Sequence, residues 1–256
     1  MTGMIRTLTS IESPHSPEVI RIVEALLEDG PMDAALQGML RAAASSTVAA
    51  EAKALLLAQD WANLGRYEAA NAALVAANER PDLVMMGNSI TEIWPMADAS
   101  FFVPGRVARG IAGQTSPQAL IRFQPDVIAL RPKSVHLLCG TNDIAGNTGP
   151  TTPYRFRCNV QAMTNLAKAS GIRVYLASLL PVTSFLWAPE IDARPWVQEL
   201  NEWLRDWAER EGHVYVDYYQ AMVDDHGGMR AELSRDGVHP NRRGYAVMRR
   251  VLEPMI

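Results

Sequence analysis

The chain of 256 residues has few cysteines, no long apolar run and no dense cluster of basic residues. Its two cysteines, Cys139 and Cys158, show no CxxC spacing, which argues against a disulfide framework and a cysteine-rich zinc site. No run approaches the roughly eighteen apolar residues that span a bilayer. Residues 1–16 also lack the apolar core of a secretory signal. We therefore expect a cytoplasmic protein without membrane insertion.

The charge and the missing motifs exclude further classes of protein. A formal net charge of −4 without clustered Lys and Arg argues against a nucleic-acid partner. Neither GxGxxG nor a GxxxxGKS/T loop occurs, so nucleotide binding has no support, and the GxSxG element of ordinary α/β hydrolases is absent. The histidines show no metal-ligand spacing. What remains is the composition of a globular protein, with 48% apolar and 20% charged residues.

The first part of the chain carries apolar side chains at helical spacing in several successive segments. Ser16 and Pro17 supply a capping hydroxyl and a proline at the first helical position. The segment holds no compact set of catalytic residue types. We expect a helical N-terminal extension over residues 1–80 that docks on the main domain as a scaffold. A lid over the site and a homo-oligomer contact are the alternatives.

Residues 81–256 alternate short apolar runs with helical segments. Two helical segments close at Gly171 and Gly212, and a β-branched run starts immediately after each. This alternation is typical of βαβ units, whose right-handed crossovers give a parallel sheet with helices on both faces. We expect a three-layer α/β/α domain with five strands, at 82–86, 106–110, 134–139, 172–179 and 213–217. Between the second and third strands, we expect helical segments around residues 117–123 and 125–130.

Polar residues of the types used in acyl transfer follow the predicted strands. Ser89 follows the first strand, Gly113 the second and Asn142 the third, while Asp236 and His239 precede the last helix. In a parallel sheet these loops open on one edge and can converge. Taken singly, Ser89 fits a helix cap equally well, and Asn142 and His239 fit turn or capping residues better than catalytic ones.

Together these residue types fit distinct chemical roles. Serine is a weak nucleophile that needs a base, which His239 can supply. Asp236, three positions earlier, can hold the other ring nitrogen of that imidazole. The backbone amides of Ser89 and Gly113, with the side-chain amide of Asn142, would form an oxyanion hole.

The segments that carry these residues resemble the four blocks of the SGNH hydrolases, also called GDSL esterases: GNSIT (87–91), GIAGQTS (110–116), GTND (140–143) and DGVHPN (236–241). The resemblance covers about residues 82–253 and implies a flavodoxin-like α/β/α fold. It implies Ser89 as the nucleophile of a triad with Asp236 and His239. Gly113 and Asn142 become oxyanion donors beside the Ser89 amide. Members of the family hydrolyse esters and thioesters, often acetyl groups on carbohydrates or lipids, without a cofactor.

One position departs from the family pattern. The first block usually reads GDS, and Asn88 replaces its aspartate here. Asparagine keeps an acceptor oxygen but loses the charge, so we expect the turn and the activity to survive. The rate and its pH dependence are what the replacement puts in question.

The leading interpretation is a serine esterase acting on short-chain esters, acetyl esters first, carried by small molecules or carbohydrates. Acyl transfer to an alcohol or sugar is one alternative, and a non-catalytic carbohydrate-binding relative is another. Trp94, Phe185 and Trp187 lie on segments that follow strands, so they are candidates for substrate contact, with hydrophobic packing as the equal alternative.

Overall fold

A computed structural model describes residues 16–256 of the chain. The stretch searched above for a secretory signal falls almost entirely within residues 1–15, outside the described residues. Four helices precede the first strand: α1 (Pro17–Leu27), α2 (Ala34–Ser45), α3 (Thr47–Gln59) and α4 (Glu68–Ala76). Ser16 caps α1 and accepts a hydrogen bond from the Val19 amide, as the Ser-Pro start predicts.

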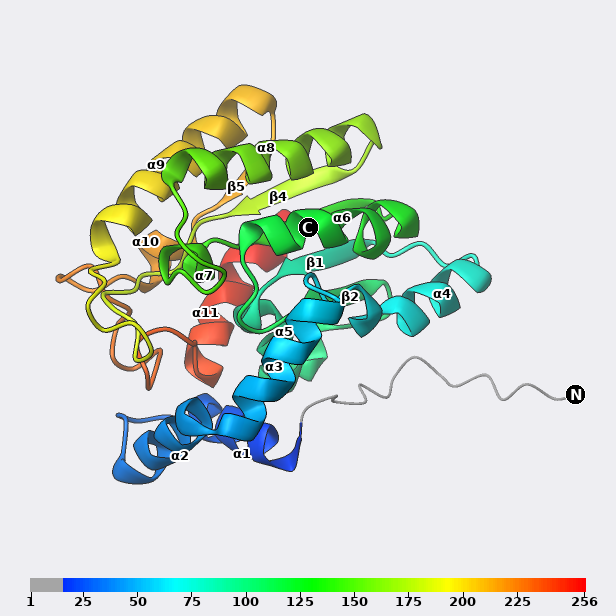
Figure 1. The fold of residues 1–256 in the computed structure, drawn as a ribbon. Coiled ribbons are helices and arrows are strands. Elements are labelled where there is room, and N and C mark those ends of the chain that lie inside the picture. The colour runs from blue at the N-terminus through cyan, green and yellow to red at the C-terminus, as the bar shows by residue number, and fades with distance from the viewer. Residues whose placement is uncertain (1–15) are drawn as a thin grey trace, which may run out of the picture.

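The rest of the described chain alternates strands and helices (Figure 1). The strands are β1 (Leu83–Gly87), β2 (Arg106–Gly110), β3 (Ser134–Leu138), β4 (Arg173–Ala177) and β5 (Val214–Val216). The helices are α5 (Ser89–Ala97), α6 (Ser116–Asp126), α7 (Thr141–Ile144), α8 (Pro153–Ala169), α9 (Arg194–Glu211), α10 (Tyr218–Met222) and α11 (Arg242–Leu252). Among residues 16–256, no helix has the length and apolar character to cross a bilayer.

The five strands form one parallel sheet in the order β2-β1-β3-β4-β5, which confirms the predicted sheet. Gly87 at the end of β1 pairs in register with Gly110 of β2 and with Leu138 of β3. The segments that follow these strands therefore leave the sheet at one edge, as the argument for a shared site requires.

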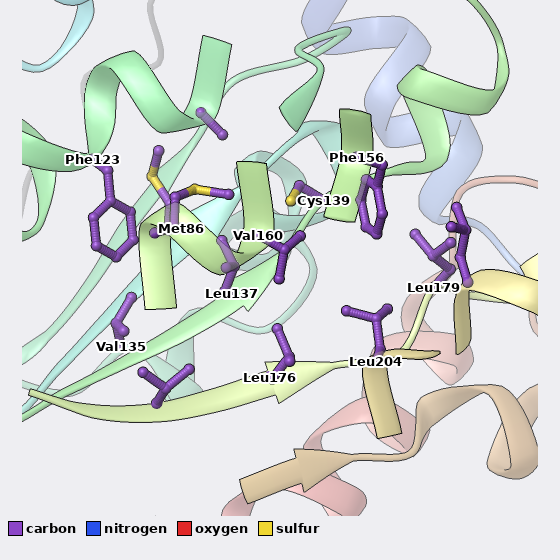
Figure 2. Close-up of a cluster of buried hydrophobic side chains, with 14 of the residues drawn as sticks. Met86, Phe123, Val135, Leu137, Cys139, Phe156, Val160, Leu176, Leu179 and Leu204 are labelled. Atoms are coloured by element: carbon purple, nitrogen blue, oxygen red, sulfur yellow. The ribbon is translucent and has the colours of Figure 1, made fainter. Parts of the chain in front are cut away.

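Helices cover both faces of the sheet, so the three-layer prediction is also confirmed. Alternate strand residues enter opposite cores: Val84 and Met86 face one side, while Leu83 and Met85 face the other. Helices α4, α6, α8 and α9 pack on the first side, part of which Figure 2 shows around Phe123, Leu137 and Leu176. Helices α1, α5, α10 and α11 pack on the second side.

Two of the N-terminal helices contribute side chains to these cores. Val23 and Leu27 of α1 lie in the second core, and Leu74 of α4 lies in the first. Helix α3 has no buried residue. The expected boundary at residue 80 stays a prediction.

Two helical segments lie between β2 and β3, as expected, but the boundary between them falls after Pro125: a 3₁₀ helix spans Ile128–Leu130. Helix α6 runs through this proline to Asp126. The proline sits in the last turn, where its missing N–H removes only one helical hydrogen bond. Arg122 and Asp126 form a buried ion pair one helical turn apart, which holds that turn closed.

Candidate active site

Ser89 is delivered by the tight junction between β1 and α5. Strand β1 ends at Gly87, Asn88 has extended backbone, and Ser89 is the first residue of the helix. The Asn88 Oδ1 atom accepts a hydrogen bond from the Ile90 amide at 3.0 Å, which is the work of a helix N-cap. The amide therefore keeps the cap that the usual aspartate would provide. Its Nδ2 atom is buried and has no hydrogen-bond partner in the described part of the chain.

The neighbouring strand end explains two glycines of the second motif. A Cβ atom on Gly110 would lie 2.2 Å from the backbone nitrogen of Glu92, so a side chain there would collide with α5. Gly113 has a φ of +74°, the left-handed region that glycine adopts without strain. These two positions let the loop after β2 turn closely around the start of α5.

The structure brings together the three residues predicted to form a triad. The Ser89 Oγ atom lies 3.0 Å from His239 Nε2, and His239 Nδ1 lies 2.7 Å from Asp236 Oδ2. Because an ionised carboxylate can only accept, Nδ1 carries the ring proton and Nε2 is free to accept from the serine hydroxyl. The other oxygen of Asp236 accepts from the backbone amides of Val238 and His239, at 2.9 and 2.7 Å. The carboxylate thus holds both the loop and the ring.

The two charged partners shift each other's protonation. Burial alone raises the pKa of Asp236, but the His239 ring and the amide donors outweigh it and lower that pKa below its ordinary value. Burial alone lowers the pKa of His239, but the carboxylate outweighs it and raises that pKa above its ordinary 6.5. Asp236 therefore stays ionised near neutral pH, and His239 becomes a stronger base.

The two remaining oxyanion candidates lie on one hydrogen-bonded rim. Asn142 donates from Nδ2 to the Gln114 carbonyl at 2.9 Å, which joins the loop after β3 to the loop after β2. Asn147 donates from its own Nδ2 to the Gly113 carbonyl at 3.1 Å and to Asn142 Oδ1 at 3.0 Å. This second bond fixes which side of the Asn142 amide carries the donors. Stabilisation of an oxyanion by Ser89, Gly113 and Asn142 stays a prediction.

Sequence reasoning missed Asn147, although it ends the GTNDIAGN segment that contains Asn142. Its carbonyl oxygen accepts a hydrogen bond at 3.0 Å from the indole nitrogen of Trp187. Trp187 is 44% exposed, so one face of this aromatic ring is open beside the oxyanion rim. Substrate contact at Trp187 stays a prediction, and Asn147 joins it to the site.

The other two aromatic candidates are corrected by the structure. Trp94 has no exposed surface and stacks on Phe101 at 5.1 Å between ring centroids, within the core beneath α5. Phe185 is 1% exposed and packs in the core on the opposite face of the sheet. Neither ring can touch a substrate in this conformation, because neighbouring side chains cover both.

Two further titratable groups have structural roles. Asp143 accepts from the backbone amide and hydroxyl of Ser116, which ties α7 to the start of α6, and burial raises the pKa of this carboxyl to about 6. His136 lies inside the sheet 2.9 Å from the Tyr218 hydroxyl, and burial lowers the pKa of its ring to about 3. Residues 16–256 contain no group of three or more His, Cys, Asp or Glu placed to hold a metal ion.

The arrangement of a serine, a histidine and an aspartate hydrogen-bonded in series at the carboxyl edge of a parallel sheet is typical of serine hydrolases. Residues 85–247 match the sequence profile of the GDSL-like Lipase/Acylhydrolase family. The chain belongs to this family, as its motifs indicated.

Solved structures agree with this assignment. A proposed acylhydrolase from Bacteroides fragilis NCTC 9343 is 41% identical, with a TM-score of 0.72 over 76% of this chain and 96% of that one. A GDSL-like lipase from Bacteroides thetaiotaomicron VPI-5482 is 40% identical, with the same TM-score over 76% and 97% of the two chains. The uncharacterized lipoprotein YqeF of Bacillus subtilis strain 168 is 28% identical over an alignment of 137 positions, and the match covers 46% of this chain and 56% of that protein.

Proposed function

We propose that this acylhydrolase is a serine esterase that cleaves short-chain carboxylic esters, acetyl esters first, through an acyl-enzyme on Ser89. The observation that carries the proposal is the continuous series of hydrogen bonds from Ser89 through His239 to Asp236. A serine hydroxyl becomes an effective nucleophile when an oriented base accepts its proton.

In each step of the proposed reaction, a proton transfer accompanies the making or breaking of a bond. Ser89 Oγ attacks the ester carbonyl carbon while its proton passes to His239 Nε2, and donors on Ser89, Gly113 or Asn142 bind the oxygen that gains charge. The imidazolium then gives its proton to the leaving alcohol as the carbon–oxygen bond breaks. Water then attacks the acyl carbon while His239 Nε2 takes one of its protons. That proton passes to Ser89 Oγ as the bond between Oγ and the acyl carbon breaks and the acid leaves. Asp236 stays ionised throughout and stabilises the charged ring.

The chemistry of the site rim supports a small acyl group on a polar leaving group. Gln114, Asn142 and Asn147 form a hydrogen-bonded wall beside the serine loop. A long acyl chain needs apolar surface to bind. Cavities of about 340 and 330 Å³ lie beside residues 146–151, but neither Ser89 nor His239 lines them. Trp187 offers an exposed aromatic face of the kind that packs on a sugar ring. The proposed substrate is therefore a small-molecule or carbohydrate ester.

Two accompanying expectations stay predictions. The similar Bacillus subtilis protein is named a lipoprotein, so the cytoplasmic location needs its own test by fractionation. Homo-oligomer contact through the N-terminal helices would use exposed side chains of α3 such as Val48 and Leu55, and light scattering of the full chain measures it.

The decisive experiment compares Ser89→Ala with Ser170→Ala, a matched change at an exposed helix end. Turnover of p-nitrophenyl esters of increasing chain length and of acetylated sugars should vanish in Ser89→Ala and persist in Ser170→Ala. A fluorophosphonate should label the wild type at Ser89, as peptide mass spectrometry would detect. Full turnover by Ser89→Ala would refute the proposal.

The same assay separates the alternatives. Added methanol gives a methyl ester if acyl transfer competes with hydrolysis, and gas chromatography detects this product. Carbohydrate binding without labelling or turnover would instead indicate the non-catalytic relative.

A further inference from the structure

The residue before the proposed catalytic acid is a buried arginine. The side chain of Arg235 is 4% exposed. Its guanidinium leaves the acid–base loop (residues 233–241) and enters the connection between α1 and α2 (residues 28–33). There it donates to the Pro31 carbonyl at 3.1 and 3.0 Å, Glu28 Oε2 at 3.2 Å and Asp33 Oδ2 at 2.6 Å, and it also donates to the Ala25 carbonyl in the last turn of α1 at 2.7 Å. All three guanidinium nitrogens thus bind the N-terminal segment.

These partners suit arginine and no other cation. The planar guanidinium presents five donors in a fixed fork, whereas a lysine ammonium is a single point on a flexible stem. Backbone carbonyls accept three of the bonds, so they recognise the fold of the connection. A cation this buried is costly unless its donors are satisfied, and here the α1–α2 connection satisfies them.

The acid–base loop itself has little regular structure. Its internal bonds include those from the Gly237 amide to the Ser234 hydroxyl and from that hydroxyl to the His239 carbonyl, at 2.9 and 2.7 Å, and those from the Val238 and His239 amides to Asp236. These bonds shape the turn, but they do not tie it to another element. Arg235 ties it to the N-terminal segment through partners that are more than 200 residues away in the chain.

The same N-terminal segment also reaches the opposite rim. Beyond α3, the carbonyls of Trp61 and Ala62 accept from the side-chain amides of Gln118 and Gln114, both at 2.7 Å. The segment therefore touches both the loop of the proposed acid and base and the loop of the proposed oxyanion donors, and α2 and α3 join the two contacts (Figure 1).

We propose that Arg235 is a positioning residue, through which the α1–α2 connection holds Asp236 and His239 in register with Ser89. The inference rests on the proposed function of these three residues. It gives the N-terminal helices a part in catalysis, beyond that of a docked scaffold. Displacement of a catalytic group by about 1 Å can lower a rate by 10²-fold, so an anchor one residue away matters.

The test uses the full chain and the rate constant for phosphonylation of Ser89 by a fluorophosphonate, which requires an aligned His239. Arg235→Lys keeps the charge but loses the fork. Asp33→Ser keeps an oxygen for its hydrogen bond to the Leu36 amide at the start of α2, yet it cannot also reach Arg235. Asp29→Ser is the matched control, because Asp29 lies on the same connection but pairs with the exposed Arg243.

We expect Arg235→Lys to react about tenfold more slowly or worse, Asp33→Ser about threefold more slowly, and Asp29→Ser like the wild type. The melting temperature of each variant is measured in parallel, and labelling is performed well below it. Equal labelling rates for folded Arg235→Lys and wild type would overturn the proposal, even if the variant melts earlier. If Arg235→Lys does not fold, equal rates for Asp33→Ser and Asp29→Ser would overturn it instead. Absence of labelling in the wild type would refute the proposed function and not this anchor.

Discussion

Two charged clusters lie near the carboxyl edge of the sheet, and they differ in access to solvent. The catalytic cluster (Ser89, Asp236, His239) leaves the His239 side chain 15% exposed above a buried carboxylate. The structural cluster (Asn71, Arg109, Arg122, Asp126) buries the ion pair of Arg122 and Asp126, at 0% and 2% side-chain exposure. Asn71 donates to Asp126 at 2.6 Å and accepts from Arg109 at 2.8 Å.

The contrast shows how similar groups acquire different roles. In the catalytic cluster, a base faces a partly buried hydroxyl and can exchange protons. In the structural cluster, the charged groups are bound to fixed partners. Arg122 also donates hydrogen bonds to Gln114 Oε1 at 2.7 Å and to the Arg109 carbonyl at 3.1 Å. The backbone carbonyl of Gln114 also accepts a hydrogen bond from the side-chain amide of Asn142. The structural cluster therefore supports the rim that carries the proposed oxyanion donors. Removing a charge should therefore impair chemistry in one cluster and folding in the other.

The largest expected effect is on the chemistry. Asp236→Asn should lower kcat/KM by about 10⁴-fold, because an amide no longer selects the tautomer of His239 that can accept a proton. The melting temperature should change little, since the Asn oxygen can still accept from the Val238 and His239 amides. Asp224→Asn is the control: Asp224 also accepts from two backbone amides, in a turn outside the catalytic cluster. Activity of Asp236→Asn within tenfold of the wild type would erase the distinction between the clusters.

The second effect is on folding. Arg122→Met should lower the free energy of unfolding by about 3–5 kcal/mol, because it leaves the Asp126 carboxylate buried without its cation. Urea denaturation measures this loss. The double variant Arg122→Met/Asp126→Leu should recover part of it, since apolar side chains can replace a buried pair. Arg194→Met, in an exposed pair with Asp192, should have a much smaller effect. No recovery in the double variant would mean that Arg122 and Asp126 stabilise the fold through contacts other than their own ion pair.

The contrast also explains what the sequence could predict. Ser89 follows a strand and the DGVHPN residues precede a helix. Local sequence patterns predict such positions. Helix α11 begins after the Asn241 cap and ends at Leu252, and both its cap and its apolar spacing are local features. The partners of Arg235 and Asn71 are not local, since tertiary folding alone brings them together. The burial of Trp94 is equally non-local, because Phe101 and Tyr245 cover it from separate segments.

The third effect is the dependence of activity on pH. His239 must be neutral to accept the serine proton, and the Asp236 carboxylate raises its pKa above 6.5 despite the opposing effect of burial. As the pH falls below that raised pKa, kcat/KM should drop by about tenfold per pH unit. A profile of kcat/KM from pH 5 to 9 should have its midpoint above 6.5. A flat rate from pH 5 to 8 would remove the proposed base from the catalytic cluster.

The fourth effect concerns the rim between the clusters. Asn147→Ala should lower kcat about tenfold, less than the 10²- to 10³-fold typical of losing an oxyanion donor itself, because Asn142 would remain but could rotate. Trp187→Phe removes the indole donor to Asn147 while keeping a ring, so it should change kcat less. Steady-state kinetics of both variants test the order. Equal kcat for Asn147→Ala and wild type would show that the Asn142 amide is held by Gln114 alone.

The smallest effect concerns Asn88, the residue before Ser89. Asn88 follows Gly87, whose carbonyl faces Arg122 at 3.4 Å, and precedes Ser89 of the catalytic cluster. Asn88→Ala removes the cap of α5 and should lower the free energy of unfolding by about 1 kcal/mol. Asn88→Asp restores the usual residue of the family, keeps the acceptor for the Ile90 amide and places a negative charge at a helix N-terminus, so it should lose less. Urea denaturation ranks the two variants, and a larger loss for the aspartate would mean that burial of its charge outweighs the cap.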